Sequence, residues 1–84
     1  MTKEEILAAG YVQIRVKRAG IWQKLTFRVE KTVSPVGLIP YLMVDRFVDM
    51  PELLRVAEET GLPVKAKNGK VFPRGKTEHD FVGL

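Results

Sequence analysis

Apolar and polar residues alternate strictly along residues 11–31, and this alternation is the strongest structural signal in the chain. A period of two predicts strands that bury one face. Ala19-Gly20 lies between the two alternating runs, where it predicts the turn of a β-hairpin. The alternating apolar positions are Val12, Ile14, Val16, Leu25, Phe27 and Val29.

The same pattern selects the register of this hairpin. A loop with an even number of residues pairs Ile14 with Leu25 and leaves the apolar side chains on one face, whereas a three-residue loop would split them between both faces. The even register gathers cations on the outer face and predicts a cation–π pair between Lys17 and Trp22. The outer pairs are then Lys17 with Trp22, Arg15 with Lys24, Gln13 with Thr26 and Tyr11 with Arg28.

A short helix is predicted at the N-terminus. Thr2 and Glu5 have the spacing of a capping box, in which each side chain binds the backbone N–H of the other residue. We therefore expect a helix over residues 3–9 that ends at Gly10, because glycine readily adopts the left-handed conformation that follows a helix.

A second helix is predicted over residues 49–60. Asp49 has the position of the N-cap, Pro51 falls in the first turn, and Gly61 ends the helix. An apolar stripe at helical spacing is expected to face the core. This stripe consists of Leu53, Leu54, Val56 and Ala57.

The segment between the first hairpin and the second helix allows two structures. Residues 41–48 are rich in β-branched and aromatic side chains and form only a short run, which favours a buried strand. Pro40, at a first helical position, would also suit a helix. In the helical case the chain would suit a winged helix-turn-helix, with the C-terminal basic hairpin as the wing.

A second hairpin is predicted by Asn68-Gly69, which is the strongest short signal for a type I′ turn. Pro73 is expected to end the pairing, because proline has no N–H to donate to a neighbouring strand. The predicted pairs are Lys67 with Lys70, Ala66 with Val71 and Lys65 with Phe72.

Together these elements predict a single small α+β domain over residues 1–84. The expected order is helix, strand, strand, strand or helix, helix, strand, strand. The two β-hairpins form an antiparallel sheet, with the helices packed on one face. The apolar tail with Phe81, Val82 and Leu84 is expected to dock on this core. The predicted core is Val12, Ile14, Val16, Leu25, Phe27, Val29, Leu53, Leu54, Ala57 and Val71.

Composition narrows the class of protein. The chain has 84 residues, of which 45% are hydrophobic and 29% are charged, as in an ordinary globular domain. It has no cysteine, which excludes disulfides, thiolate nucleophiles and cysteine zinc sites and suits a cytoplasmic protein. The scarcity of Asn and Gln beside many charged residues indicates a thermophilic source. Neither a signal peptide nor a membrane span is expected.

Positive charge is concentrated in the two predicted hairpins. Residues 11–31 carry six cations and one acid, and residues 61–76 carry five cations and no acid, whereas the rest of the chain is acidic. Solvated lysines on a sheet also prevent edge-to-edge association, so this pattern has a purely structural interpretation. The exclusion of acids and the interleaved aromatics Tyr11, Trp22 and Phe72 instead favour a surface for a polyanion.

The main functional hypothesis is therefore a small, basic, non-catalytic protein that binds DNA or RNA through the outer faces of both hairpins. This function requires neither a metal nor a cofactor. The predicted contact residues are Arg15, Lys17, Trp22, Lys24, Arg28, Lys65, Lys67 and Lys70.

The alternative hypothesis is a protein-interaction module or accessory subunit, most simply a homo-oligomer. Residues 36–48 and the C-terminal tail are apolar enough to form an interface. The basic hairpins would also suit an acidic protein partner, or the acidic helix (residues 49–60) of a second copy.

No enzymatic constellation is predicted. The segment from Gly69 to Thr77 has five residues between its glycines, where a phosphate-binding loop has four, and a proline interrupts it. His79 is the only histidine, and acid–base chemistry would need Asp45 or Asp80 beside it in a pocket. The spacing of these residues is not that of a metal site.

Overall fold

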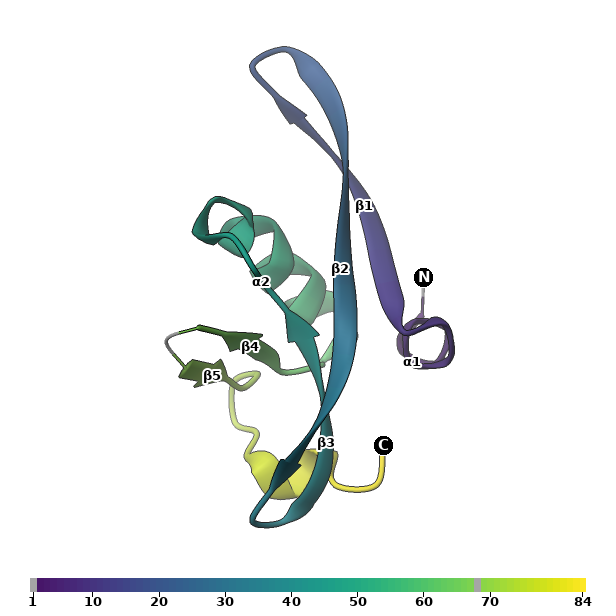
Figure 1. Cartoon of the computed structure of the whole chain (residues 1–84), viewed down its shortest axis with the longest axis vertical. Helices are drawn as coiled ribbons and strands as arrows, with labels where there is room; N and C mark the ends of the chain where they lie inside the picture. The colour runs from purple at the N-terminus through teal and green to yellow at the C-terminus, as the bar shows by residue number, and fades with distance from the viewer. Residues whose placement is uncertain (1, 68) are drawn as a thin grey trace.

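The computed structural model describes residues 2–67 and 69–84, and within them the chain forms a five-stranded mixed sheet with two α-helices (Figure 1). The predicted α+β class is confirmed. The strands are ordered β1-β2-β3-β4-β5 across the sheet. In chain order the elements are α1 (Lys3–Ala9), β1 (Tyr11–Arg18), β2 (Ile21–Ser34), β3 (Gly37–Met43), the 3-10 helix η1 (Phe47–Asp49), α2 (Met50–Thr60), β4 (Val64–Ala66), β5 (Gly69–Val71) and the 3-10 helix η2 (Glu78–Phe81).

The first hairpin has the predicted register, with Ile14 opposite Leu25. Its loop is Ala19-Gly20, and φ is positive at both positions, 52° and 77°, as a type I′ turn requires. β2 is longer than predicted, because it pairs with β1 in its first half and with β3 in its second half. Residues 11–28 therefore form a two-stranded arm, and its tip projects past α2 (Figure 1).

The uncertain middle segment forms a strand, but with bounds that differ from the prediction. β3 covers Gly37–Met43 rather than residues 41–48. Pro40 fits inside β3 because the N–H it lacks would have no partner. Alternate N–H groups of a strand point to the same side, so residues 40 and 42 both face β4. The Leu42 N–H donates to the Pro63 carbonyl at 2.8 Å, where β4 begins. Pro40 lies beyond that end, so its missing N–H breaks no bond to β4. Because this segment is a strand, the winged helix-turn-helix alternative is wrong.

β3 and β4 are parallel, which corrects the prediction of a sheet made from two antiparallel hairpins. Leu42 pairs with Val64 and Met43 pairs with Lys65. Parallel neighbours need a crossover connection, and α2 provides it. Alternation along a strand carries no information on the direction of its partner, so this β–α–β unit was not visible in the sequence pattern.

The second hairpin is present, but its turn lies one residue earlier than predicted, so that each residue meets a partner two positions away from the expected one. Both registers keep Val64 and Val71 on the same face, and the alternating pattern therefore cannot distinguish them. Asn68, half of the predicted turn, lies outside the described residues. The observed pairs are Val64 with Val71, Lys65 with Lys70 and Ala66 with Gly69, in place of Ala66 with Val71, Lys65 with Phe72 and Lys67 with Lys70.

α1 is confirmed together with both of its ends. The Thr2 hydroxyl accepts a hydrogen bond from the Glu5 N–H, and the Glu5 carboxylate accepts one from the Thr2 N–H, both at 3.2 Å. This backbone hydrogen bond lowers the pKa of Glu5. Gly10 ends the helix with φ at 81°, and α1 buries Ile6 in the core.

α2 ends at Gly61 and has Asp49 at its N-cap, as predicted, but the Asp49 side chain does not cap the helix. Asp49 makes no side-chain hydrogen bond to the first turn of the helix. Its carboxylate instead accepts a hydrogen bond from Arg18 at 2.9 Å and lies 3.9 Å from Arg46. The side chain that local sequence assigns to the helix end thus holds the arm against the start of α2.

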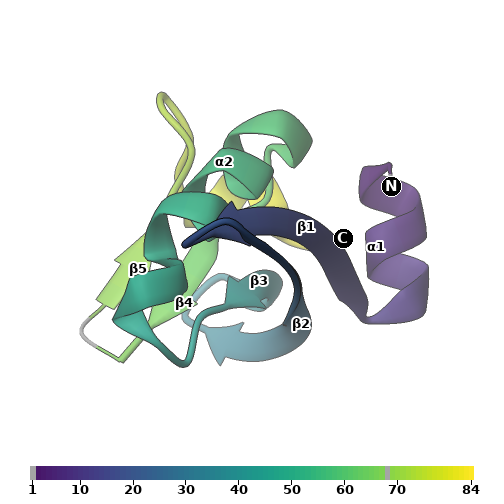
Figure 2. The ribbon, with the colours of Figure 1, turned by 90° about the horizontal axis from the view of Figure 1, so that it is seen from above.

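Two clusters of buried side chains pack against the sheet. Adjacent residues of a strand point to opposite faces, and accordingly Leu42 belongs to the larger cluster and Tyr41 to the smaller one. Both α-helices contribute to the larger cluster, although they lie well apart on the coiled sheet (Figure 2). η2 covers the other face of β3 through Phe81. The predicted docking of the tail is therefore confirmed for Phe81, whereas Val82 and Leu84 remain partly exposed.

The predicted core is mostly correct and has two exceptions. Leu54 and Val71 are 40% and 45% exposed, so neither belongs to the core. The expected positions on the first hairpin are buried or half-buried. Val56 of the predicted apolar stripe and Phe81 of the predicted docking tail are also buried. Buried apolar residues that the pattern did not assign to the core are Ile6, Ile39, Tyr41, Leu42, Val44, Leu62 and Val64.

Candidate nucleic-acid interface

The outer face of the arm carries an exposed tryptophan beside two cations. Trp22 is 59% exposed. The guanidinium carbon of Arg15 lies 5.6 Å from the centroid of its ring, and Nζ of Lys17 lies 6.0 Å from it. The predicted Lys17–Trp22 pair is confirmed, and Arg15 joins it from the diagonal position. Each contact of this kind contributes about 0.5–1 kcal/mol at an exposed site, which favours one arrangement of the three side chains.

Lys24 completes this group, which we call the tip cluster (Arg15, Lys17, Trp22 and Lys24). Lys24 lies directly opposite Arg15 in the ladder, so two like charges face each other. Among the described residues, none of the three cations forms an ion pair with an acid. No acid occurs between residues 11 and 29. The tip cluster is therefore a site of uncompensated positive charge around an exposed aromatic ring.

Arg18, on the opposite face of β1, is neutralised. Its guanidinium lies 2.9 Å from the carboxylates of Asp49 and Glu52 and donates to the Val48 carbonyl at 3.1 Å. The hydrogen bond from Arg18 lowers the pKa of Glu52, and the two carboxylates raise the pKa of Arg18. This contact fixes the arm to the start of α2 without using any residue of the tip cluster.

Arg28, a predicted contact residue near the base of the arm, is also paired. Its guanidinium donates two hydrogen bonds to the Asp45 carboxylate, at 3.1 and 3.4 Å. Glu30 lies 4.0 Å from the same guanidinium. These two acids compensate the charge of Arg28, so the free positive charge of the arm is concentrated toward its tip.

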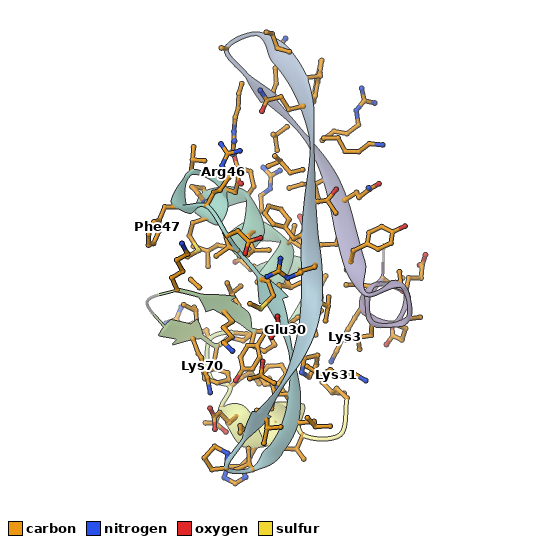
Figure 3. The ribbon with its side chains drawn as sticks, in the orientation of Figure 1. Lys3, Glu30, Lys31, Arg46, Phe47 and Lys70 are labelled. Carbon is orange, nitrogen blue, oxygen red and sulfur yellow. The ribbon has the colours of Figure 1, made fainter. Side chains whose placement is uncertain are left out.

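The second hairpin does not repeat the arrangement of the tip cluster. Lys70 binds Glu78 at 3.3 Å and lies 5.6 Å from the centre of the Tyr41 ring, and the hydrogen bond to Glu78 raises the pKa of Lys70. Lys65 donates to the Thr32 hydroxyl at 3.5 Å. Lys67 is exposed in the turn. Lys65 and Lys70 thus contact the protein itself, and Figure 3 shows Lys70 far from the tip of the arm.

The two basic hairpins belong to the same face of the sheet but do not form one patch. The registers place Lys65 and Lys70 on the face that also carries the tip cluster. On this face η2 covers β3 at Ile39 and Tyr41. Phe72, expected as an exposed aromatic, packs instead against the rings of Tyr41 and Phe81, with centroid distances of 6.2 and 6.1 Å. The predicted site residues therefore form two groups.

A shallow hollow beside the tip cluster contains a cation that sequence reasoning missed. It has a volume of about 320 Å³ and lies between β1 and α2. Arg55 of α2 lines it together with Arg15, Lys17 and Trp22, and Glu52 lies in the same wall. Arg55 is the one cation of α2, which carries three acids, and only the packing of α2 beside the arm brings it to this site.

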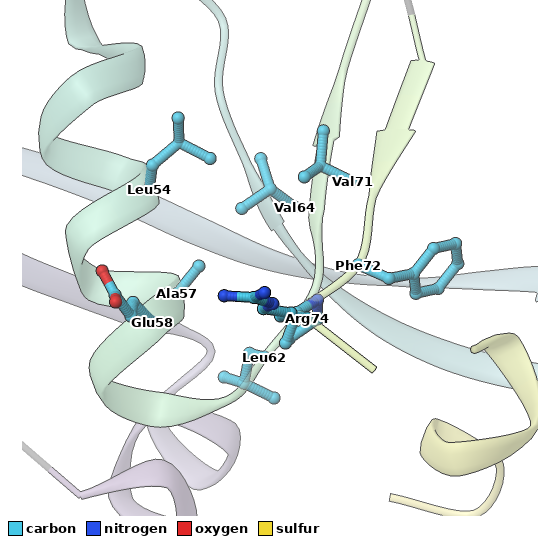
Figure 4. A pocket seen from close by; sticks show the side chains of 9 residues that line it. Leu54, Ala57, Glu58, Leu62, Val64, Val71, Phe72 and Arg74 are labelled. Atoms are coloured by element: carbon cyan, nitrogen blue, oxygen red, sulfur yellow. The ribbon is translucent and has the colours of Figure 1, made fainter. Parts of the chain in front are cut away.

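A second hollow lies between α2 and the β4–β5 hairpin (Figure 4). Its volume is about 370 Å³, and its walls are mainly apolar. Leu54 and Val71, the two predicted core residues that are exposed, line opposite walls. Glu58 and Arg74 lie at its polar side, and Arg74 extends toward α2 (Figure 4). This cleft is an opening of the larger core cluster toward solvent.

The residues considered for acid–base chemistry, His79, Asp45 and Asp80, are all exposed. His79 lies on the exposed side of η2. Residues 2–67 and 69–84 contain no group of three or more His, Cys, Asp or Glu side chains arranged to hold a metal ion. Over the same residues, none of the helices has the length and apolar character needed to cross a bilayer.

Comparison with protein-family models, with curated proteins and with solved structures finds no match for this chain. Its function must therefore be argued from the geometry and charge of its own surface.

Proposed function

We propose that this protein binds nucleic acid through the outer face of the arm and catalyses no reaction. The observation that carries the proposal is the tip cluster: three cations without acidic partners surround an exposed tryptophan on a projecting two-stranded arm. Phosphate contact and base stacking need these two chemistries side by side. The contact surface is smaller than the sequence indicated, because Arg28, Lys65 and Lys70 have partners within the chain.

The charges of the tip cluster favour a ligand-binding surface over a surface that contacts only water. Arg15 and Lys24 are directly opposed, and Lys17 lies beside them, so their mutual repulsion is relieved when a polyanion approaches. Arg18 on the same strand is neutralised by two acids, Asp49 and Glu52, where it packs against α2. Among the described residues no acid forms an ion pair with the tip cluster, which leaves its charge available to a ligand.

The exposed tryptophan at the tip also favours a contact surface. Trp22 is 59% exposed although it is large, whereas Ile21 lies on the opposite face of β2, away from the tip cluster. Lysines suffice to keep a strand soluble and to protect its edge, so solvation alone gives no reason for an exposed tryptophan there. A ligand that presents aromatic bases would cover this surface.

Binding should be tested by fluorescence anisotropy with labelled single-stranded and duplex DNA and RNA at about 50 mM salt, where phosphate contacts are strong. The triple variant Arg15→Gln/Lys17→Gln/Lys24→Gln should bind at least about tenfold more weakly. Its dependence of log K on log salt should be less steep by about 2–3, as expected for the loss of three phosphate contacts.

The matched control is Lys3→Gln/Lys31→Gln/Lys76→Gln, which removes the same charge away from the arm. It should retain most of the affinity. Equal losses in both variants would show a non-specific effect of net charge. Undetectable binding of every nucleic acid by the unmodified protein would refute the proposed function.

A homo-oligomer is the second candidate, and one observation favours it. Val33 and Leu38 lie opposite each other on β2 and β3 and are 78% and 53% exposed. Within the interface expected at residues 36–48, most of residues 39–44 is buried inside the chain, whereas Phe47 and Val48 are 65% and 53% exposed. Sedimentation velocity over a range of concentrations tests this function. Self-association that Val33→Ser/Leu38→Ser abolishes would support it, and a monomer at every concentration would exclude it.

A further inference from the structure

We propose that the arm selects single-stranded over duplex nucleic acid, with Trp22 stacking on a base and Arg55 of α2 binding a phosphate beside it. This inference rests on the proposed function and adds the class of ligand. It also adds a residue outside the arm to the site.

The outer face of the arm carries aromatic rings at both ends and cations between them. Trp22 faces Lys17 near the tip, and Tyr11 is 43% exposed near the base, on the same face. Lys17 follows Tyr11 by six positions along β1, which corresponds to about 20 Å along a strand. Arg15 lies between the two rings. This order of ring, cation and ring matches a short extended strand whose phosphates alternate with bases free to stack.

The side of the arm offers a place for the sugar and phosphate next to the stacked base. The hollow of about 320 Å³ is bounded by Trp22 and Arg15 of the arm and by Arg55 of α2. Among the described residues Arg55 forms no ion pair. Glu52 in the same wall is bound to Arg18 at 2.9 Å, and it is the one acid among the lining residues beside three cations. A phosphate in this hollow therefore meets Arg15 and Arg55 from two elements.

A duplex cannot use these groups in the same way. The bases of a duplex are stacked on one another. Trp22 can therefore stack on a base only after that base has been removed from the duplex stack, which is unfavourable. The arm would then bind a duplex through its cations alone. A single strand presents its bases without this cost, and stacking on one aromatic ring changes affinity by about 5- to 150-fold.

The chain provides a direct readout, because Trp22 is its one tryptophan. Stacking of a base on the indole should quench the intrinsic fluorescence. We expect titration with an oligothymidylate of about 12 nucleotides, a length within the range of known single-strand sites, to quench this emission. A duplex of the same length should bind more weakly and quench less.

Variants separate stacking from charge. Trp22→Ala should weaken single-strand binding by about 5- to 150-fold and leave duplex binding nearly unchanged, and Trp22→Phe should restore part of the loss. Ile21→Ala is the matched control, because Ile21 is a neighbouring exposed apolar residue that lies outside the proposed stack. It should bind as the unmodified protein does.

Arg55→Gln should weaken single-strand binding several-fold, while the control Arg74→Gln on the far side of α2 should not. Equal or tighter binding of the duplex would overturn the inference but leave the proposed function intact. Single-strand affinity that is unchanged in Trp22→Ala would overturn it in the same way. Failure of both nucleic acids to bind would instead refute the proposed function itself.

Discussion

Neighbouring cations on β1 have different surroundings, because successive side chains of a strand point to opposite faces. Lys17 lies on the outer face beside Trp22, whereas Arg18 lies on the inner face between Asp49 and Glu52. In the sequence both belong to one basic run. The face of β1 on which each side chain lies thus distinguishes Arg18, which stabilises the fold, from Lys17, which is available to a ligand.

Arg18→Gln should lower the melting temperature by a few degrees near neutral pH, because Asp49 and Glu52 lose their partner. The pKa of Glu52 lies below its ordinary value of 4.5 in the folded chain. Ionised Glu52 therefore stabilises the fold above pH 4.5, and this contribution is lost as the pH falls through the lowered pKa. The difference between the two proteins should shrink in acid.

Thermal unfolding followed by circular dichroism at several pH values measures this difference. Arg18→Lys keeps the charge but not the planar guanidinium, and should fall between the two proteins. A difference in melting temperature that grows as the solution becomes more acidic would contradict the role given to the Arg18–Glu52 pair.

At the scale of elements, the number of paired residues in two neighbouring strands determined whether their register could be predicted from the sequence. β1 and β2 share eight residue pairs with one alternating pattern, so only one register suits the core. β4 and β5 share three pairs, and two registers keep the same side chains on the same face. Short strands therefore leave the register to contacts with the rest of the molecule. The position of Asp49 at the N-cap of α2 was predicted correctly, but its carboxylate binds Arg18 from another element instead of the first turn of the helix.

The turn of the arm contains a strained residue, and a substitution there should stabilise the protein. Ala19 has φ at 52°, a left-handed conformation that is unfavourable for a residue with a Cβ. Asn tolerates this conformation, and Asn-Gly is a favoured type I′ pair, so Ala19→Asn should raise the free energy of unfolding by about 0.5–1 kcal/mol. Ala19→Val should lower it. Urea denaturation measures both, and an Asn variant no more stable than the parent would argue against a strained turn.

At the scale of the whole molecule, sequence patterns could not show which elements meet. The parallel pairing of β3 with β4 depends on the path of α2, and the two core clusters depend on η2 returning to β3. The candidate site depends on the same contacts. Trp22, Arg15 and Lys17 were found from alternation on one hairpin. Arg55 was not, because it reaches the site from a distant element.

Adjacent leucines of α2 provide a test of the packing. Leu53 is fully buried in the larger cluster, whereas Leu54 is 40% exposed at the cleft. Leu53→Ala should lower the free energy of unfolding by about 2–5 kcal/mol. Leu54→Ala should lower it by about 1 kcal/mol or less, because its side chain remains largely in water. Similar losses for both variants in chemical denaturation would contradict the orientation of α2.

The two-stranded construction of the arm implies that it opens separately from the body. β3 pairs only with the second half of β2, so the part of the arm near its tip has a free edge on either side. An isolated two-stranded ribbon is marginally stable, and local opening does not require the core to unfold. Amide hydrogens near the tip should therefore exchange with solvent much faster than those of β3 and α2. A bound ligand would be detected first as slower exchange within the arm alone.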